Sequence, residues 1–504
     1  MIPLRKQYVV LPSYGFRSAT LERAASLRPT IPPAAGRRDV PMAAPISPEA
    51  GIELLDYVSA DGPRLVEMTP EAELALRIEE PDLKIVPVVR YRTMKMQHRI
   101  LREASASVRT TRSAAANLFV KDTDGNPIPG AQVIAFTNFR TKAGDEGISD
   151  DQGRVRLRIA KGTSLDRIYV YGPPTYWGHS ARRYELVSNA TVALESVDLR
   201  RASLALNRFR AGIPVDAGTN VIVGIVDTGI ARDHPLLPNV SGGANMVSEE
   251  TRDDPGRINE WGPAAVDGEH GTHVAGIVGA RPTADIPLSG VAPGVTLRSY
   301  RVFPHSGEGA INYDIMNAID RAVQDGCHII NLSLGGGAED EAVRAAIGSA
   351  LSRGVIVIAA AGNDGRKPVS FPAALPFCIA VSAMGRRDSF PQVSTEALDI
   401  AAPFGANDSF VGAFSNFGPQ IDLTGPGVGV VSTLPGATYG PMSGTSMATP
   451  AVAGYAAFLL ASNNTIFQQI DENRSRALTD ALFEAARAVG FGRDYEGFGL
   501  PGQG

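Results

Sequence analysis

The chain has 504 residues, which exceeds the usual length of one domain, so we expect more than one. Hydrophobic residues make up 44% and charged residues 20%, as in ordinary globular proteins. The net charge of -5 at pH 7 provides no basic field, so we expect no binding to nucleic acid. No apolar run is long enough to span a bilayer, and no signal-peptide core follows the basic N-terminal residues. These two observations favour a cytoplasmic location for the protein, without contact to a membrane.

The N-terminal part of the chain divides into two regions. Residues 1–50 are rich in Ala, Pro and Arg without a period, which predicts an irregular leader. Residues 51–105 have the pattern of a small α/β unit, in which Thr69 and Pro70 are suited to begin a helix. The expected strands and helix of this unit are 52–58, 64–68, 70–80 and 84–92. The basic residues between 90 and 102 are expected to form a solvated linker.

Residues 115–198 combine short strand patterns with turn signals. Turn-forming residues occur at 122–127 and 151–154. In residues 154–159, apolar residues alternate with arginines, which is typical of a strand with one exposed face. Together these patterns predict a β-sandwich. The pattern "DxDGxPIxGAxV…DxxGR" resembles the carboxypeptidase-regulatory-like and transthyretin-like modules.

Residues 205–492 alternate between buried-strand and helical patterns. Such alternation predicts an α/β domain, with a parallel sheet covered by helices on both faces. The expected strands are 221–226, 328–334, 355–361 and 377–382, and the expected helices are 313–324 and 339–352. Cys327 and Cys378 lie in or beside apolar stretches, so we expect two buried thiols, although a single disulfide is the alternative. Residues 493–504 are Gly-rich and are expected to be a frayed tail.

An aspartate ends the first of these strands. The apolar run 221–226 is followed by Asp227 and, closely, by Gly229. The carboxyl ends of strands in open α/β sheets face the ligand crevice. A carboxylate at this place can orient a histidine, but a structural turn explains the same residues when they are considered alone.

Two histidines lie three residues apart in the segment "HGTHVAG". His270 and His273 would lie near one face of a helix, and the small residues that follow suit close packing on the sheet. A metal site is the competing interpretation, but no third ligand is evident and the glutamate-containing zincin motif is absent. We therefore expect no metal, with His270 facing the crevice and His273 packed inside.

A serine stands at the start of a long apolar helix in the segment "SGTSMATPAVAGYAAFLL". The free N–H groups and the partial positive charge of a helix N-terminus would stabilise an oxyanion beside Ser446. A simple N-cap is the alternative for this segment alone.

The segments "DTG", "HGTHVAG" and "GTSMA" together resemble the subtilisin-like serine peptidases, in which the triad has the chain order Asp, His, Ser. The resemblance implies that Asp227 orients and stabilises the imidazole. It implies that His270 is the general base and then the general acid, and that Ser446 is the nucleophile.

The same resemblance implies further roles. In "AAAGND", Asn363 corresponds to the oxyanion-hole amide, with the Ser446 N–H as the second donor. In "NLSLGG", Ser333, Leu334 and Gly335 correspond to the strand that binds extended substrate. Asparagine often stands where this chain has Ser443, and histidine where it has Ala451, and neither difference affects the triad.

The acidic neighbour of the oxyanion-hole amide suggests a specificity hypothesis. Asp364 follows Asn363 directly in the chain. A carboxylate there could favour a basic residue in the pocket for the side chain that precedes the scissile bond.

The chemistry predicts a serine endopeptidase that acts on polypeptides through an acyl-enzyme. Residues 51–105 loosely resemble subtilisin propeptides in size and element order, so we expect a self-processing zymogen whose N-terminal segment is its intramolecular inhibitor. No cofactor is required. Calcium binding occurs in the family near the loop 281–289, but that loop has no clear set of ligands.

Two other functions stay open. A transpeptidase or macrocyclase on the same triad would need a device that keeps water from the acyl-enzyme, and none is evident. A non-catalytic binding protein on a protease fold usually carries a substitution in the triad, and none is found.

Overall fold

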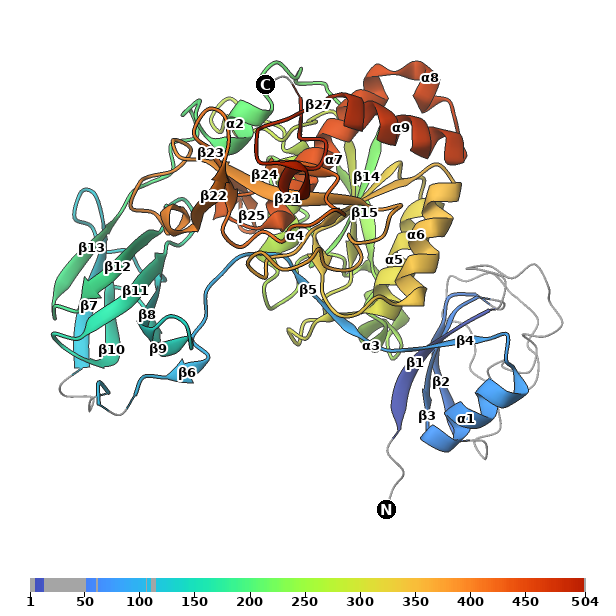
Figure 1. Cartoon of the computed structure of the whole chain (residues 1–504), viewed down its shortest axis with the longest axis horizontal. Coiled ribbons are helices and arrows are strands. Elements are labelled where there is room, and N and C mark those ends of the chain that lie inside the picture. Colours follow the sequence, from blue (N-terminus) through green and yellow to red (C-terminus); the bar gives the residue numbers. More distant parts are fainter. Residues whose placement is uncertain (1–4, 13–50, 60–61, 106, 110–114, 503–504) are drawn as a thin grey trace.

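The computed structural model describes residues 5–12, 51–59, 62–105, 107–109 and 115–502. Figure 1 shows a large α/β domain with a smaller unit on either side of it. One of these is a sheet-and-helix unit that contains the N-terminal strand, and the other is a unit of two sheets. Strand β5 (Arg90–Thr93) runs along the α/β domain between the two smaller units (Figure 1).

The sheet-and-helix unit has one sheet with the order β2-β3-β1-β4 and one helix. Its elements are β1 (Lys6–Leu11), β2 (Ile52–Tyr57), β3 (Arg64–Met68), α1 (Pro70–Glu79) and β4 (Lys84–Pro87). The predicted start of the helix is confirmed, because the Thr69 side chain accepts the N–H of Ala72 and Pro70 is in the first turn.

The predicted irregular leader is wrong for Lys6–Leu11. This segment is a strand that pairs antiparallel with both β3 and β4. Its last four side chains are buried, on both faces of the strand. Tyr8 and Val10 pack in the core of the small unit, whereas Val9 and Leu11 pack against the α/β domain. An apolar run this short has no detectable period, and residues far along the chain stabilise it. Residues 1–4 and 13–50 of the predicted leader lie outside the described residues.

The two-sheet unit contains sheets with the orders β10-β7-β13 and β12-β11-β8-β9-β6. Residues from both sheets, such as Leu118 and Val133, form one core. The arginines of β10 are exposed and its apolar residues are buried, as the alternation predicts. The strands are β6 (Arg102–Glu103), β7 (Ala115–Asp122), β8 (Gln132–Asn138), β9 (Ala143–Ile148), β10 (Arg154–Ala160), β11 (Ser164–Tyr171), β12 (His179–Glu185) and β13 (Ala190–Leu194).

The α/β domain is built on a nine-stranded sheet with the order β15-β16-β14-β18-β20-β21-β23-β22, and β24 also pairs with β21. The central strands are parallel, as predicted, but β21–β23 and β22–β23 are antiparallel, so the sheet is mixed. The strands of the domain are β14 (Ile222–Asp227), β15 (Val240–Asn245), β16 (Thr296–Arg301), β17 (Ala310–Ile311), β18 (Ile329–Leu332), β19 (Leu334–Gly335), β20 (Ile356–Ala360), β21 (Ile379–Arg386), β22 (Ile400–Phe404), β23 (Ser409–Gly412), β24 (Leu423–Pro426), β25 (Val430–Leu434), β26 (Thr438–Met442), β27 (Ala486–Arg487) and β28 (Leu500–Pro501).

Helices cover both faces of this sheet. Val223 and Ile225 of β14 belong to the core that includes α4 and α7, and Val226 belongs to the core that includes α5 and α6. The helices are α2 (Ala205–Phe209), α3 (Ser248–Thr251), η4 (Pro255–Asn259), α4 (Glu269–Gly279), α5 (Asn312–Gln324), α6 (Glu341–Ser352), η5 (Thr395–Asp399), α7 (Thr445–Ser462), α8 (Asn464–Phe467), α9 (Glu472–Glu484) and α10 (Arg493–Glu496).

The predicted frayed tail is wrong for the described part of residues 493–504. Arg493–Glu496 is a short helix, and β28 pairs with β27. The Glu496 carboxylate is buried and accepts backbone N–H groups from residues 489–492. The glycines of this region permit the turns that these contacts require, so glycine content alone was a misleading signal.

Both cysteines are buried and unbonded, which confirms the prediction of two free thiols. Burial raises the pKa of Cys327 to about 12 and keeps its thiol protonated.

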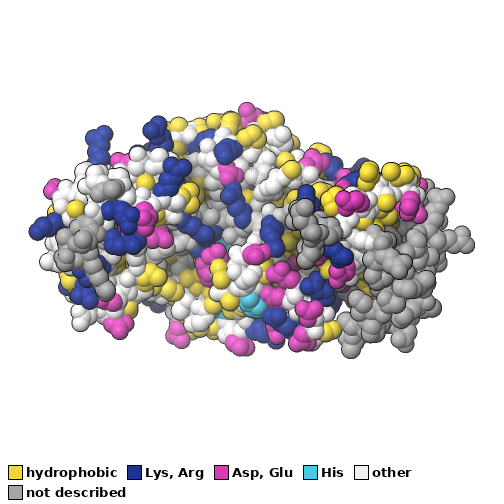
Figure 2. Space-filling view, turned by 90° about the horizontal axis from the view of Figure 1, so that it is seen from below, with side chains coloured by type: hydrophobic (Ala, Val, Ile, Leu, Met, Phe, Trp, Pro, Cys, Tyr) yellow, Lys and Arg dark blue, Asp and Glu magenta, His cyan; other side chains and the backbone are white. Residues whose placement is uncertain are grey.

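The surface carries charges of both signs. On the face in Figure 2, basic and acidic side chains are interspersed over the described residues and do not gather in one basic patch. Among the helices of the described ranges, none has the length and hydropathy that crossing a membrane would require.

Trp177, in the loop between β11 and β12, joins the two-sheet unit to the α/β domain. Its side chain is 2% exposed and lies in the same core as Phe390. Close to it, the N–H of Thr175 donates to the carbonyl oxygen of Tyr439 at 2.7 Å. A buried indole combined with backbone hydrogen bonds fixes the position of this unit on the domain.

Replacing Trp177 with alanine should therefore loosen this contact. We expect Trp177→Ala to lower the free energy of the first unfolding transition in urea by about 3–5 kcal/mol, since a large buried side chain is lost. The control is Val187→Ala in the same unit, where the side chain is 53% exposed and the change should stay within about 0.5 kcal/mol. Equal losses in the two variants would contradict the anchoring role.

Candidate active site

Asp227 and His270 meet at the carboxyl end of the central sheet. Asp227 is the last residue of β14, and His270 is the second residue of α4. The Nδ1 of His270 and the Oδ1 of Asp227 are 2.7 Å apart, and the same oxygen accepts the N–H of Thr228 at 2.7 Å. A carboxylate in this position fixes the imidazole tautomer with its proton on Nδ1. The Nε2 of His270 has no hydrogen-bond partner among the described residues, so it is available as a base.

His273 lies on the inner side of the same helix. Its Nε2 bonds the carbonyl oxygen of Gly440 at 3.0 Å, and burial lowers its pKa to about 3. The ring is therefore neutral and packed inside, as the sequence predicted for the second histidine of the pair.

Ser446 is the second residue of α7. Its Oγ donates to the carbonyl oxygen of Ser333 at 2.9 Å, and its backbone N–H donates to the carbonyl oxygen of Met94 at 3.2 Å. Gly444, just before the helix, has φ of 151° and lies so close to Met94 that a Cβ would collide with the Met94 carbonyl oxygen. Only glycine allows the two backbones to approach in this way.

The carbonyl oxygen of Met94 receives two hydrogen bonds. Besides the Ser446 N–H, the Nδ2 of Asn363 donates to it at short range. The Oδ1 of Asn363 accepts from both the N–H (3.0 Å) and the hydroxyl (2.9 Å) of Thr445, which fixes the orientation of the amide. Two donors that converge on one carbonyl oxygen can stabilise negative charge as it develops there.

Strand β5 leads into this site between two strands of the α/β domain. It pairs antiparallel with β17 on one side and with β19 on the other, and the N–H of Met94 continues the ladder to the carbonyl oxygen of Ser333 at 3.2 Å. Leu334 pairs with Thr93, and Gly335 pairs with Arg92. The three residues assigned to substrate binding therefore line a segment of the chain itself.

The side chains of this segment occupy pockets. Tyr91 and Met94 are each 1% exposed. The Tyr91 hydroxyl donates to the Asp340 carboxylate, and the end of the Met94 side chain packs on Gly335. The carboxylate of Asp364 pairs with Arg92, so it contacts a side chain two residues before Met94. This arrangement gives no support to a role for Asp364 in the pocket of Met94.

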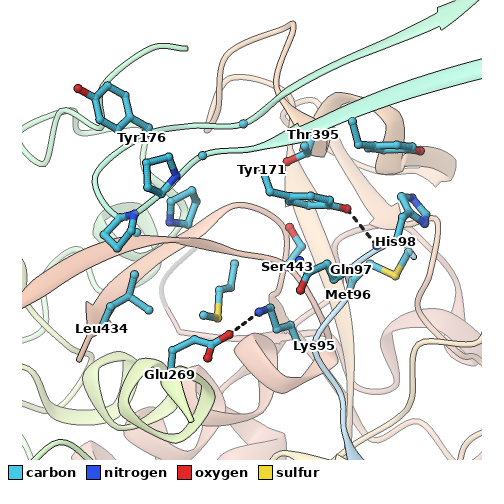
Figure 3. A pocket seen from close by; sticks show the side chains of 18 of the residues that line it. Lys95, Met96, Gln97, His98, Tyr171, Tyr176, Glu269, Thr395, Leu434 and Ser443 are labelled. Carbon is cyan, nitrogen blue, oxygen red and sulfur yellow. Dashed lines mark hydrogen bonds and ion pairs between the residues drawn. The ribbon is translucent and has the colours of Figure 1, made fainter. Parts of the chain in front are cut away.

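Beyond Met94 the chain continues past the other side of the site. The N–H of Met96 donates to the carbonyl oxygen of Ser443 at 2.7 Å, and the Nζ of Lys95 lies 2.7 Å from the Oε1 of Glu269 (Figure 3). Sequence reasoning missed these residues, since it treated residues 90–102 as a linker. The strand predicted at 84–92 includes most of β5, but the prediction assigned it no role in the site.

One group of side chains in the described ranges has metal-ligand composition. Glu250, Glu260 and His305 lie within reach of one another. However, the carboxylate of Glu250 already binds Arg301 at 2.7 Å and Arg257 at 3.2 Å. Although burial opposes it, the hydrogen bond from Arg301 lowers the pKa of Glu250 to about 2. This group is therefore part of an ion-pair network. Arg301 and Arg257 balance the negative charge of its two carboxylates.

The family model described as the Subtilase family matches residues 218–499. The chain is 37% identical to subtilisin NAT of Bacillus subtilis subsp. natto over 252 residues, which cover 49% of this chain and 57% of that protein. It is 38% identical to a subtilisin of Bacillus pumilus over 252 residues, which cover 49% of this chain and 79% of that protein. The chain thus spans little more than half the length of subtilisin NAT. Since the family model covers more than half of the chain, this protein belongs to the Subtilase family.

Proposed function

We propose that this protein is a serine endopeptidase made as a self-processing zymogen, and that it cleaves its own chain between Met94 and Lys95. The observation that carries the proposal is the hydrogen bonding of the Met94 carbonyl oxygen. The Asn363 side chain and the Ser446 N–H both donate to it, as an oxyanion hole does to the carbonyl under attack.

In the proposed reaction, the Ser446 Oγ turns from its present acceptor and attacks the Met94 carbonyl carbon. His270 Nε2 takes the hydroxyl proton, and Asp227 stabilises the imidazolium that forms. The bond from Met94 to the Lys95 nitrogen then breaks, and His270 returns the proton to that nitrogen. Water, activated in the same way, hydrolyses the acyl-enzyme. These steps use only side chains of this chain and water, so no cofactor is proposed.

The N-terminal segment acts as the inhibitor in this proposal. After the cut, residues up to Met94 would stay in the cleft as a bound product, held by the pairing of β5 on both edges and by the buried Tyr91. Peptide substrates would then use the same strand pairing, in which main-chain bonds supply affinity and side-chain pockets supply preference.

The two-sheet unit would remain with the active enzyme. It lies after the proposed cut and is anchored to the α/β domain through Trp177. Removal of residues 1–94 therefore leaves this contact intact, and the unit is proposed as a permanent part of the protease.

The first test is self-cleavage, followed by intact mass over time. Wild-type protein should separate between Met94 and Lys95 and react with a fluorophosphonate at Ser446, whereas Ser446→Ala should remain whole and unlabelled. Ser462→Ala, at the exposed far end of the same helix, should behave like the wild type. A wild-type protein that stays whole and unlabelled, or that is cut at another bond first, would overturn the proposal.

The second test concerns the oxyanion donor. Asn363→Ala should lower kcat on a peptide substrate by about 10²–10³-fold with a smaller change in KM, because the donor acts mainly in the transition state. Asn473→Ala, on the exposed start of α9, is the matched control and should leave kcat unchanged. A loss below about threefold would remove Asn363 from the proposed role.

The third test concerns inhibition by residues 1–94. Tyr91→Ala empties a buried pocket, so the cleaved segment should dissociate faster and peptide-cleaving activity should appear at protein concentrations where the wild type is still inhibited. A shift of roughly 30-fold in that concentration is expected for a buried aromatic contact. Arg92→Ala removes an exposed ion pair and should shift it by less than about fivefold. Equal shifts would show that the pocket does not secure the inhibitor.

A further inference from the structure

A cavity of about 540 Å³ lies on the far side of the proposed scissile bond, between the α/β domain and the two-sheet unit. Its walls include Tyr171 and Tyr176 from one side and Leu434 and Glu269 from the other (Figure 3). The chain enters this cavity directly after Met94. The cavity is therefore the place for the residues that follow the scissile bond.

Glu269 presents a carboxylate at the entrance of this cavity. It is the first residue of α4 and directly precedes His270, so the helix that positions the imidazole also positions this carboxylate. Figure 3 shows the Glu269 carboxylate and the Lys95 ammonium group pointing toward each other. The side chains are 34% and 17% exposed, respectively, and the ion pair is 2.7 Å long. Partial exclusion of water strengthens such a pair relative to one on an open surface.

The backbone around this ion pair is held independently of it. The N–H of Met96 donates to the carbonyl oxygen of Ser443 at 2.7 Å, and the N–H of His98 donates to the Tyr171 hydroxyl at 3.1 Å. Neither bond involves the side chain of residue 95, so both remain possible with another residue at that position. We therefore expect another side chain at position 95 to begin at the same place, beside the Glu269 carboxylate that Lys95 contacts.

Glu269 is also the charged group best suited to attract a cation here. Apart from the segment that enters the cavity, the side chains in its walls that carry a carboxyl group are Glu269, Glu396 and Asp399. Burial raises the pKa of Asp399 to about 8, so this carboxyl group is mostly neutral at pH 7. Burial also raises the pKa of Glu396, which disfavours its charged form. Burial would likewise raise the pKa of Glu269, but the nearby Lys95 ammonium outweighs it and the pKa is lowered.

We propose that Glu269 makes this protease select lysine or arginine at the position directly after the scissile bond. This inference rests on the proposed function, since it assumes cleavage between Met94 and Lys95. It identifies the substrate class as polypeptides with a basic residue on the leaving-group side of the cut, and it assigns the preference to one carboxylate.

A charge exchange in the full chain tests the proposal. Lys95→Glu places two carboxylates together and Glu269→Lys places two ammonium groups together, so each should slow self-cleavage at least roughly tenfold. The double variant restores an ion pair of reversed direction and should recover most of the wild-type rate, even if each single change also disturbs packing. Lys161→Glu, in the exposed turn after β10, changes the net charge equally and should have no effect.

Peptides added to the processed enzyme, after the cleaved residues 1–94 have been separated from it, give an independent readout. The probes carry the chain's own residues 90–97, with Lys, Arg, Ala or Glu at the position of Lys95. For wild-type enzyme, kcat/KM should be highest with Lys and Arg and at least roughly tenfold lower with Glu. For Glu269→Gln, the four values should lie within about threefold of one another. Repeating the assay in Lys95→Ala enzyme removes competition from the enzyme's own new N-terminus.

The outcomes separate the two proposals. If wild-type protein neither cleaves itself nor any peptide, the proposed function fails. If it cleaves itself at Met94–Lys95 but the double variant is no faster than the single ones, and peptides with Lys, Ala and Glu are cleaved equally, the function stands and the role of Glu269 is wrong.

Discussion

Backbone pairing on both edges of β5 is the constraint on which the arrangement of this molecule depends. Because β17 and β19 each hydrogen-bond to β5, the segment Arg90–Thr93 has one register in the cleft. That register brings the carbonyl oxygen of Met94 between the Asn363 amide and the Ser446 N–H. A slip by one residue would turn Tyr91 and Met94 out of their pockets, since side chains alternate along a strand. The side-chain pockets and the backbone hydrogen bonds therefore specify the same register for β5.

The positions of the two smaller units follow from the course of β5 through the cleft. The sheet-and-helix unit lies at the entry of β5 and buries one face of its sheet against the α/β domain. The two-sheet unit lies at the exit and is fixed by a separate contact through Trp177. The segment between them must cross the cleft in an extended conformation. In the proposed function, this geometry makes the first substrate a part of the enzyme, bound before any reaction occurs.

The sequence predicted those features whose causes are local. Asp227 ends a buried strand and Ser446 begins a long apolar helix, so short segments were enough to place each on its element, and the structure places Asp227 and His270 in contact. The segments that sequence reasoning missed depend on distant partners. Lys6–Leu11 becomes a strand through pairing with residues more than fifty positions away. The single strand predicted at 84–92 is in fact two, β4 and β5, because the α/β domain provides two edges for Arg90–Thr93. A pattern within a short segment does not indicate whether such distant partners exist.

The burial of Trp177 has a spectroscopic consequence. The chain contains two tryptophans, and the other, Trp261, lies half-buried near the surface with the Arg232 guanidinium 4.1 Å from the centre of its ring. An indole in a dry core emits at shorter wavelengths than a hydrated one. We therefore expect two components in the intrinsic fluorescence. Trp177, between the two-sheet unit and the α/β domain, should emit at the shorter wavelength, and Trp261, which follows η4, at the longer one. Separation of the two-sheet unit from the α/β domain can thus be followed in the unlabelled protein, as a shift of the Trp177 emission to longer wavelength.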